Sequence, residues 1–232
     1  VGLTLALGLA RSMEGLQVAV LDRRAFRVPR DKRASAIAAG ARRLFEALGI
    51  WGEVAEEAEA VREMRITDSG TGDIARPLFL SFEGAIGRDE PFAHMVPNTA
   101  LAGALLGALE GRAALLGEVE IAGFSTDGPV ARLDLKDGSA IAAPLVVAAD
   151  GAMSALRGMA GIGTITHDYR QAGIVTTIGH ELPHEGVAYE HFRPAGPFAS
   201  LPLSGNRSSL VWTERPDDAA RYRAMPLDEL AR

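Results

Sequence analysis

The chain opens with apolar residues at helical spacing, which predict an N-terminal helix. This stripe consists of Leu3, Leu5, Ala6, Leu9 and Ala10. Residues 16–22 then form a mainly apolar run that predicts a strand ending in Asp22. A helix followed by a strand that ends in an acidic residue is typical of the second half of a dinucleotide-binding βαβ unit. In such a unit the acidic residue binds a ribose hydroxyl, and the G-x-G-x-x-G turn would end here at Gly2. The same pattern occurs in α/β proteins that bind no nucleotide, so both interpretations stay open.

A second apolar run, residues 145–149, ends in Asp150 and Gly151 and is followed by Ser154 and Arg157. We expect a buried parallel strand that brings a carboxylate and a flexible turn to the carboxyl edge of a sheet. Open α/β sheets bind cofactors at that edge. The alternative is a strand, an Asp-Gly turn and a helix without a ligand.

The middle of the chain predicts a departure into a second sheet. A helix from Ile37 to Leu48 ends at Gly49, which suits the position after a helix C-terminus. Short β-like runs follow between residues 65 and 82, with glycine-rich stretches at 69–73 and around Gly84 and Gly87. Another helix then begins, with Asn98 or Thr99 as its N-cap.

The remaining pattern is mainly that of strands. A three-stranded meander is predicted at 119–124, 130–135 and 139–142, with turns at Asp127-Gly128 and Asp137-Gly138. An antiparallel sheet is predicted at 173–178, 187–192, 198–203 and 208–213. The expected fold is therefore mixed α/β: a Rossmann-like domain with an inserted antiparallel meander, and a second, antiparallel-sheet domain that lines a substrate pocket.

Composition narrows the classes of function. The chain has 232 residues, 47% of them hydrophobic, and a formal net charge of −6, which argues against a nucleic-acid-binding protein. The absence of cysteine removes disulfides, thiolate metal sites and cysteine nucleophiles. No apolar run approaches the length of a membrane span, so the cytoplasm is the default location.

A cationic segment follows Asp22 and has two interpretations. Its basic residues are Arg23, Arg24, Arg27, Arg30, Lys32 and Arg33. Such a run is commonly a solvated loop. Beside a nucleotide fold it could instead hold the diphosphate of a cofactor or capture an anionic cosubstrate.

One short motif matches a zinc-protease pattern but lies in a segment that is not expected to be helical. Residues 180–184 match H-E-x-x-H, in which a zinc protease holds both imidazoles on one helical face. Pro183 lies inside that stretch and the flanks predict strands, so no helix and no metal site are expected.

Several runs of residues carry a family resemblance along nearly the whole chain. They are residues 1–7, 31–51, 96–98, 148–157, 169–172, 184–192, 196–199 and 201–203. In these runs the chain resembles the ubiquinone-biosynthesis aromatic hydroxylases, flavoprotein monooxygenases of the para-hydroxybenzoate hydroxylase fold. The Asp150-Gly151 element is shared by the wider class of flavin hydroxylases, whereas Tyr169-Arg-Gln-Ala and Gly196-Pro-Phe-Ala point to the ubiquinone branch.

The resemblance implies FAD as cofactor and NAD(P)H as cosubstrate. It places Gly2 and Asp22 at the adenosine part of FAD, and Arg33 and Asn98 against the cofactor. Asp150 and Gly151 would lie near the pyrophosphate and the approach of NAD(P)H. It assigns no catalytic residue.

The same resemblance implies that reduced flavin forms a C4a-hydroperoxide with dioxygen, which hydroxylates a polyprenylated phenol or quinol. Phe192, Pro197 and Leu201 are candidates for an apolar pocket wall beside the ring, and the alternative is that they are ordinary core residues. Other functions remain open: a hydroxylase of another aromatic compound, a flavin reductase or halogenase, or a flavin-free scaffold subunit of a biosynthetic complex.

The resemblance also divides the chain. Residues 1–64 and 96–164 are expected to form the FAD-binding domain, and residues 65–95 and 165–232 the substrate domain. The chain is expected to be truncated at both ends, without the first strand and its glycine turn and without a later Gly-Asp-Ala-like motif. The implied partners are the small aromatic substrate, dioxygen and either a second copy or a ubiquinone-biosynthesis complex, with peripheral membrane association through substrate or partners.

Overall fold

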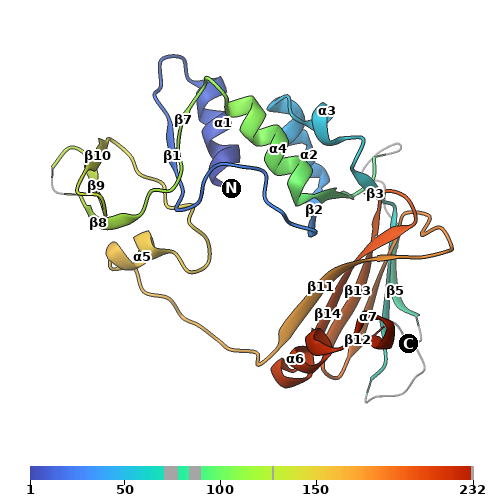
Figure 1. The fold of residues 1–232 in the computed structure, drawn as a ribbon. Coiled ribbons are helices and arrows are strands. Elements are labelled where there is room, and N and C mark those ends of the chain that lie inside the picture. The colour runs from blue at the N-terminus through green and yellow to red at the C-terminus, as the bar shows by residue number, and fades with distance from the viewer. Residues whose placement is uncertain (71–77, 84–89, 127, 231–232) are drawn as a thin grey trace. The chain divides into compact units, whose positions relative to one another are not determined.

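The computed structural model describes residues 1–70, 78–83, 90–126 and 128–230 (Figure 1). The chain divides into two compact units. The first unit contains residues 1–28 and 103–167, and the second contains residues 29–102 and 168–232. Parts of the predicted glycine-rich stretches at 69–73 and around Gly84 and Gly87, and the predicted turn residue Asp127, lie outside the described residues.

The first unit pairs a short parallel sheet with helices. Helix α1 (Gly2–Ser12) leads into strand β1 (Ala19–Leu21), which pairs in parallel with β7 (Ala114–Leu116). Helix α4 (Asn98–Leu109) precedes β7, and its residues from Gly103 onward belong to this unit. The predicted helix and the strand that leads to Asp22 are present, while the strand β7 and its parallel pairing with β1 were not predicted.

An antiparallel meander follows within the same unit, as the sequence predicts. Its strands are β8 (Ile121–Ser125), β9 (Ala131–Leu135) and β10 (Ala140–Ala143), in the order β10-β9-β8 (Figure 1). The turn between β9 and β10 is closed by Asp137, whose carboxylate accepts hydrogen bonds from the Ser139 amide at 2.9 Å and hydroxyl at 2.6 Å. Gly138 has a φ of +88°, which a glycine adopts without strain.

Residues 145–149 correct one prediction. They form no strand with any residue that the structure describes, and Leu145 and Val147 are 74% and 51% exposed. A strand requires a backbone partner, and β1 and β7 pair only with each other among the described strands. The Asp150-Gly151 turn is therefore held by side-chain and local hydrogen bonds, and helix α5 (Ala155–Met159) follows it.

The second unit contains a small sheet with the order β2-β6-β3. These strands are β2 (Ala34–Ala38), β6 (Ala93–Pro97) and β3 (Glu59–Val61), accompanied by helices α2 (Ala39–Ala47) and α3 (Trp51–Val54). The helix predicted from Ile37 begins at Ala39 instead, because Ile37 pairs with His94 in the sheet. The predicted end is confirmed, since Gly49 adopts a φ of +64° directly after the C-cap Leu48.

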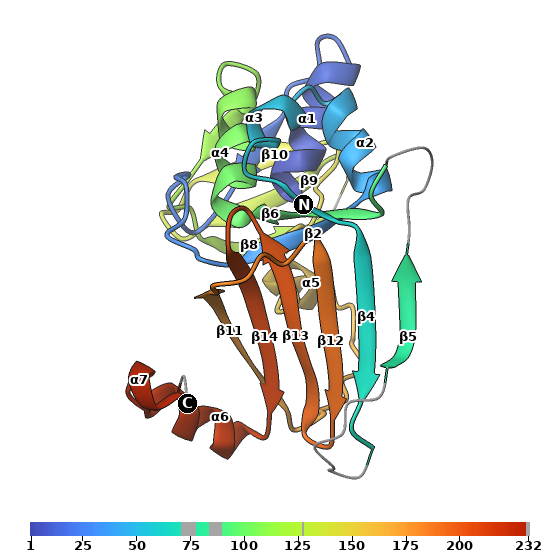
Figure 2. The ribbon, with the colours of Figure 1, turned by 90° about the vertical axis from the view of Figure 1, so that its right-hand side faces the viewer.

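A six-stranded sheet forms the larger part of this unit, in the order β11-β14-β13-β12-β4-β5 (Figure 2). The strands are β4 (Glu63–Asp68), β5 (Leu78–Glu83), β11 (Ala172–Gly179), β12 (Val187–Arg193), β13 (Gly196–Leu203) and β14 (Arg207–Glu214). The four predicted C-terminal strands are antiparallel neighbours, while β12 meets β4 in parallel. Helices α6 (Pro216–Ala224) and α7 (Leu227–Leu230) end the described chain.

The register of this sheet gives its two sides different compositions. One side, the polar face, carries Glu63, Arg65, Thr67, Tyr189, His191, Arg193, Trp212 and Glu214, together with the apolar Phe198, Pro202 and Leu210. The other side, the apolar face, carries Met64, Ile66, Ala188, Phe192, Pro197, Ala199, Leu201, Leu203 and Val211, together with the polar Asp68, Glu190, Arg207 and Ser209. Helix α6 covers part of the polar face, where the Tyr222 ring lies 4.5 Å from that of Trp212.

The apolar face joins the small sheet through a shared core. Ala188 and Leu203 are buried against Val61, Ala93 and Met95, with Met64, Leu201, Ala34 and Phe92 packed around them. Burial of this apolar surface is what fixes β12 and β13 against β3 and β6.

The mixed α/β fold class, with its meander and second antiparallel sheet, is confirmed. The boundaries of the two compact units follow packing, and the expected division by function into 1–64 with 96–164 and 65–95 with 165–232 remains a prediction.

Gly196 yields a test of this sheet. Its φ is +139°, and a Cβ placed on it would lie 2.5 Å from Thr213 Cγ2 and 2.9 Å from Gln171 Nε2. We expect Gly196→Ala to destabilise the protein by about 1–3 kcal/mol, measured by urea unfolding, because the neighbours must move. Gly173→Ala in β11 is the control, since nothing lies within 4 Å of its Cβ position; equal losses for the two variants would contradict the steric explanation.

Candidate functional site

The N-terminus of α1 lies beside the Asp150-Gly151 segment. A Cβ on Gly2 would lie 3.4 Å from the Cβ of Ala149, so the fold brings two predicted site elements together. No side chain caps α1, and its first turn carries no acidic residue. Amides at the start of a helix that lack a side-chain cap can bind an anion such as a phosphate.

Asp22 lies directly after β1, at the carboxyl end of a parallel strand. Its Oδ1 accepts a hydrogen bond of 2.9 Å from the Arg24 amide, which orients the carboxylate. Its side chain is exposed, and Oδ2 has no hydrogen bond from the residues that the structure describes. A fixed carboxylate with one free oxygen at this edge suits a ribose hydroxyl.

Asp150 organises the turn that precedes α5. One carboxylate oxygen accepts the Ser154 hydroxyl at 2.5 Å, and the other accepts the Leu156 amide at 3.3 Å. Ser154 in turn caps α5 by accepting the Arg157 amide at 3.0 Å. Burial by itself would raise the pKa of Asp150, but the hydrogen bonds from Ser154 and Leu156 outweigh burial and hold that pKa below its usual value.

Gly151 is shaped by the same hydrogen bonds. Its φ of +90° lies in the region that favours glycine, and a Cβ there would meet nothing within 4 Å. The Arg157 guanidinium donates to the Ala152 carbonyl at 3.0 Å and so holds the turn from the other side. Asp150 therefore acts in this structure as an anchor that keeps the Gly151 backbone in one conformation.

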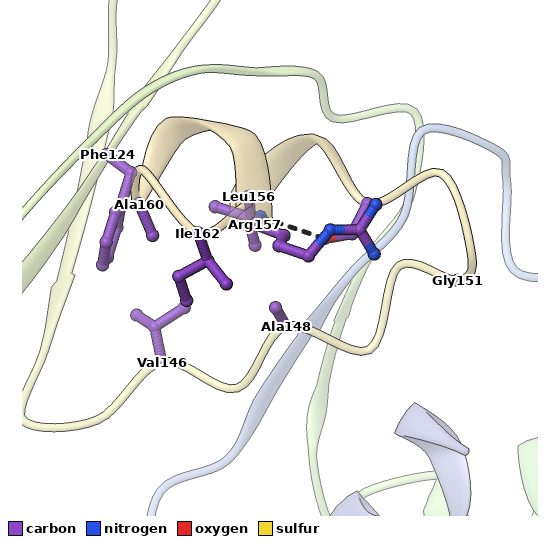
Figure 3. A pocket seen from close by; sticks show the side chains of 9 residues that line it. Phe124, Val146, Ala148, Gly151, Leu156, Arg157, Ala160 and Ile162 are labelled. Atoms are coloured by element: carbon purple, nitrogen blue, oxygen red, sulfur yellow. Dashed lines mark hydrogen bonds between the residues drawn. The ribbon is translucent and has the colours of Figure 1, made fainter. Parts of the chain in front are cut away.

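A cavity of about 450 Å³ lies beside this turn within the first unit (Figure 3). Figure 3 shows the apolar side chains of Phe124, Val146 and Ile162 gathered at one end, while Arg157 extends toward Gly151. The cavity thus combines an apolar wall with one cation next to the turn.

The second unit holds a separate polar cluster, the Asn98 cluster, made of Asp31, Arg33, Ser35 and Asn98. Arg33 makes a two-pronged contact with Asp31, with Nε at 3.0 Å from both carboxylate oxygens and a second nitrogen at 2.8 Å from Oδ2. The Asn98 amide donates to Asp31 at 3.2 Å and accepts the Ser35 hydroxyl at 2.7 Å. Asn98 thus links the loop before β2 to the start of α4, a different role from the N-cap expected for it.

Asp31 is the charged centre of this cluster. Hydrogen bonds from the Arg33 side chain and amide, together with that from Asn98, hold the pKa of Asp31 well below its usual range. Arg33 itself is 65% exposed at its side chain, so it can still face a ligand. Arg33 and Asn98 were predicted from the sequence as site residues, but their partners Asp31 and Ser35 were not. The Asp-x-Arg spacing is a local signal for Asp31, whereas no local signal marks Ser35.

The three predicted pocket residues share the apolar face. Phe192 and Pro197 are direct cross-strand partners, and Leu201 lies further along β13. Phe192 is 41% exposed, whereas Leu201 packs against the core shared with β3 and β6. This face adjoins the loop of the Asn98 cluster, because Thr177 of β11 donates to the Lys32 carbonyl at 3.3 Å.

The H-E-x-x-H residues form no metal site. His184 Nδ1 accepts the Gly186 amide, and its Nε2 contacts the carbonyls of Leu203 and Gly205 at 2.8 and 3.0 Å. Both ring nitrogens therefore serve the loop before β12. Nowhere in the part of the chain that the structure describes do three potential ligands gather as a metal site would require.

Comparison with known proteins decides the family. Residues 1–230 match the model of a family described as an FAD binding domain. The chain belongs to the FAD-binding domain family. The expected cofactor FAD is thereby confirmed, and the uncapped start of α1 and the free oxygen of Asp22 fit a dinucleotide in this FAD-binding domain.

Relatives of this FAD-binding domain carry ubiquinone-related names. It is 41% identical to the ubiquinone hydroxylase UbiL of Rhodospirillum rubrum over 98% of this chain and 53% of that protein. It is 33% identical to the 3-demethoxyubiquinol 3-hydroxylase of Escherichia coli over 99% of this chain and 59% of that protein. The chain thus spans little more than half the length of these relatives.

Solved structures show the same fold. PqsL of Pseudomonas aeruginosa, titled a probable FAD-dependent monooxygenase, superimposes with a TM-score of 0.78 at 21% identity, over 96% of this chain and 60% of that one. The p-nitrophenol 4-monooxygenase PnpA of Pseudomonas putida gives 0.77 at 17% identity, over 95% and 57%. None of the helices in the described residues is long and apolar enough to cross a bilayer.

The Asn98 cluster predicts an acid-dependent part of stability. The pKa of Asp31 is lower in the folded state than in the unfolded state. Its contribution to the free energy of unfolding is therefore fully present above the unfolded-state pKa of about 4, and it is lost as the pH falls toward the folded-state pKa. We expect the free energy of unfolding of Asp31→Asn, measured by urea titration between pH 5 and pH 3, to fall less steeply than that of the wild type.

Arg33→Gln removes the largest cause of the lowered pKa of Asp31 and is the companion variant. It should flatten the same part of the pH profile, because Asp31 then loses its strongest donor. Wild-type slopes in both variants would contradict this account of the cluster.

Proposed function

We propose that the protein containing this chain is an FAD-dependent, NAD(P)H-consuming aromatic monooxygenase that hydroxylates a polyprenylated phenol or quinol in ubiquinone biosynthesis. The observation that carries the proposal is the apolar face of the six-stranded sheet in an FAD-binding-domain protein, next to the Asn98 cluster in the same unit. The names of the similar hydroxylases from R. rubrum and E. coli support the substrate class.

The residues of this chain have distinct tasks in that proposal. Gly2 and Asp22 bind the adenosine part of FAD, Asp150 and Gly151 shape the backbone near the pyrophosphate and the approach of NAD(P)H, and Arg33 and Asn98 contact the cofactor. Bound FAD supplies the redox chemistry with dioxygen. The protein itself orients the substrate and excludes water around it.

Phe192, Pro197 and Leu201 form the wall against which the substrate lies. Ile66 and Val211 extend the same face beside Glu190 and Ala199 and offer further apolar contacts to a ring or a prenyl tail. Each buried methylene of such a tail contributes about 0.8 kcal/mol, so an apolar wall of this kind favours prenylated over unsubstituted phenols.

The full-length protein tests this function. We expect it to be yellow, to release FAD on denaturation, and to oxidise NAD(P)H faster when a prenylated phenol is added, with a hydroxylated product detected by mass spectrometry. A colourless protein without FAD would favour a scaffold subunit and overturn the proposal. Oxidation without hydroxylation would favour a flavin reductase, and hydroxylation of only unprenylated phenols would favour another aromatic substrate.

The Asp150 anchor provides a mutational test of cofactor binding. In the full-length protein, Asp150→Ala removes the acceptors of the Ser154 hydroxyl and the Leu156 amide, so the Gly151 turn loses its fixed shape. We expect a lower FAD content, or a slower flavin reduction by NAD(P)H at saturating FAD.

Asp137→Ala is the matched control, because it disrupts an Asp-Gly turn of the same unit that also binds a serine hydroxyl and amide. It should leave FAD content and flavin reduction unchanged. If Asp150→Ala behaves like Asp137→Ala in both measurements, Asp150 has no part in the cofactor site.

A further inference from the structure

Glu190 is a charged residue in the middle of the apolar face. It lies on β12 between Ala188 and Phe192, which share its face, and it is paired across the sheet with Ile66 of β4 and Ala199 of β13. Its four nearest neighbours on this face are therefore apolar. Ala188 is fully buried in the core shared with β6, whereas Phe192 is 41% exposed, so Glu190 marks the point where the core ends and the accessible part of the face begins.

Glu190 differs from the other carboxylates in the middle of this sheet. On the polar face, Glu63 accepts hydrogen bonds from Arg65 and Ser81, and Glu214 accepts them from Arg193 and Trp212. The half-buried Glu190 side chain has no hydrogen bond or ion pair with any of the residues that the structure describes. The fold thus supplies donors to the carboxylates of one face and leaves this one for another donor.

An occupant of the apolar face would change the surroundings of Glu190. Ring and tail atoms lying on Ile66 and Phe192 would displace water from the carboxylate between them. Burying a carboxylate without a hydrogen bond is costly, so a tightly bound occupant must itself donate one. A phenol or quinol hydroxyl is such a donor, whereas a quinone carbonyl or an aryl ether presents only acceptors and would face the carboxylate with lone pairs.

We propose that Glu190 is a specificity-determining residue of the substrate site: its carboxylate accepts a hydrogen bond from the ring hydroxyl and selects phenols and quinols over the matching ethers and quinones. This proposal rests on the proposed function, because it assumes that an aromatic substrate lies on the apolar face. It adds the residue that recognises the hydroxyl and the oxidation state of the ring that the site accepts.

Binding and turnover of a matched pair of ligands test the proposal. The probes are 2-geranylphenol and its methyl ether, titrated into the FAD-loaded full-length protein and followed by the change in flavin absorbance, with ligand-stimulated NAD(P)H oxidation as the second measurement. The wild type should bind the phenol about 10- to 100-fold more tightly than the ether, the range expected for a hydrogen bond to a charged group.

Glu190→Gln keeps the size of the side chain and exchanges one acceptor oxygen for an NH₂ donor. We expect its affinity for the phenol to fall about tenfold, and its affinity for the ether to stay or rise, because the amide can donate to the ether oxygen. If Glu190 had only a structural role, Glu190→Gln would lower the affinity for both ligands by the same factor. Glu83→Gln removes an exposed carboxylate from β5 of the same sheet, opposite Glu63, and should leave the ratio of the two affinities unchanged.

The outcomes separate this inference from the proposed function. If the wild type binds both ligands equally, or if Glu190→Gln keeps the wild-type preference, the role of Glu190 is overturned while hydroxylation of the phenol still supports the proposed function. If the FAD-loaded wild type neither binds the phenol nor responds to it in NAD(P)H oxidation, both proposals fail. If Glu190→Gln does not fold, the wild type alone still tests the proposal. A ratio of phenol affinity to ether affinity near one would then overturn the role of Glu190.

Discussion

The alternation of side chains along β12 is the constraint on which the second unit depends. Successive residues of a strand point to opposite sides of the sheet, so Tyr189, His191 and Arg193 face one way and Ala188, Glu190 and Phe192 the other. The first set makes polar contacts with other strands of the sheet, such as Thr67 of β4 with His191 Nδ1 at 2.7 Å and Glu214 of β14 with Arg193 at 2.8 Å. The second set packs into the core near β6 and then continues as an apolar surface. A shift of one residue in register would exchange the two faces.

Carboxylates in this molecule fall into two groups according to their donors. Asp31 and Asp150 are saturated by nearby protein donors, which lowers the pKa of each and turns each into an anchor for a loop. Asp22 and Glu190 keep acceptor capacity that no described residue uses. The first pair fixes the backbone of a loop, whereas the second pair can still accept hydrogen bonds, which we propose come from a ribose at Asp22 and from a substrate ring at Glu190.

Asp150 and Asp31 each fix the backbone of a loop, one in the first unit and one in the second. Asp150 holds a turn that no described strand supports, through Ser154 and the amide of Leu156. Asp31 holds the loop before β2 to the start of α4, through Arg33 and Asn98. In both cases a short side chain accepts several hydrogen bonds, so the local backbone is fixed without a large hydrophobic core. Such preorganisation lowers the entropy that ligand binding would otherwise cost.

Periodicity alone determined much of this protein. The spacing of apolar residues predicted α1, the strand before Asp22, the meander and the four C-terminal strands, because local pattern and final structure agree there. Family resemblance added the predictions that Gly2, Asp22, Asp150 and Gly151 lie in a nucleotide site and that Phe192, Pro197 and Leu201 lie on a pocket wall.

Tertiary structure decided what depends on partners distant in sequence. Ala34–Ala38 became a strand because β6 pairs with it, although Ile37 fits a helical pattern; residues 145–149 stayed unpaired because no described strand meets them. Asn98 binds Ser35 and Asp31 across 63 and 67 residues of sequence rather than capping its own helix. Glu190 looks like an ordinary exposed position in an alternating strand, and only the pairing of β12 with β4 and β13 surrounds it with apolar neighbours. Hydrophobic spacing reports which face a residue occupies, whereas hydrogen-bond partners depend on which strands meet, and local sequence does not encode that.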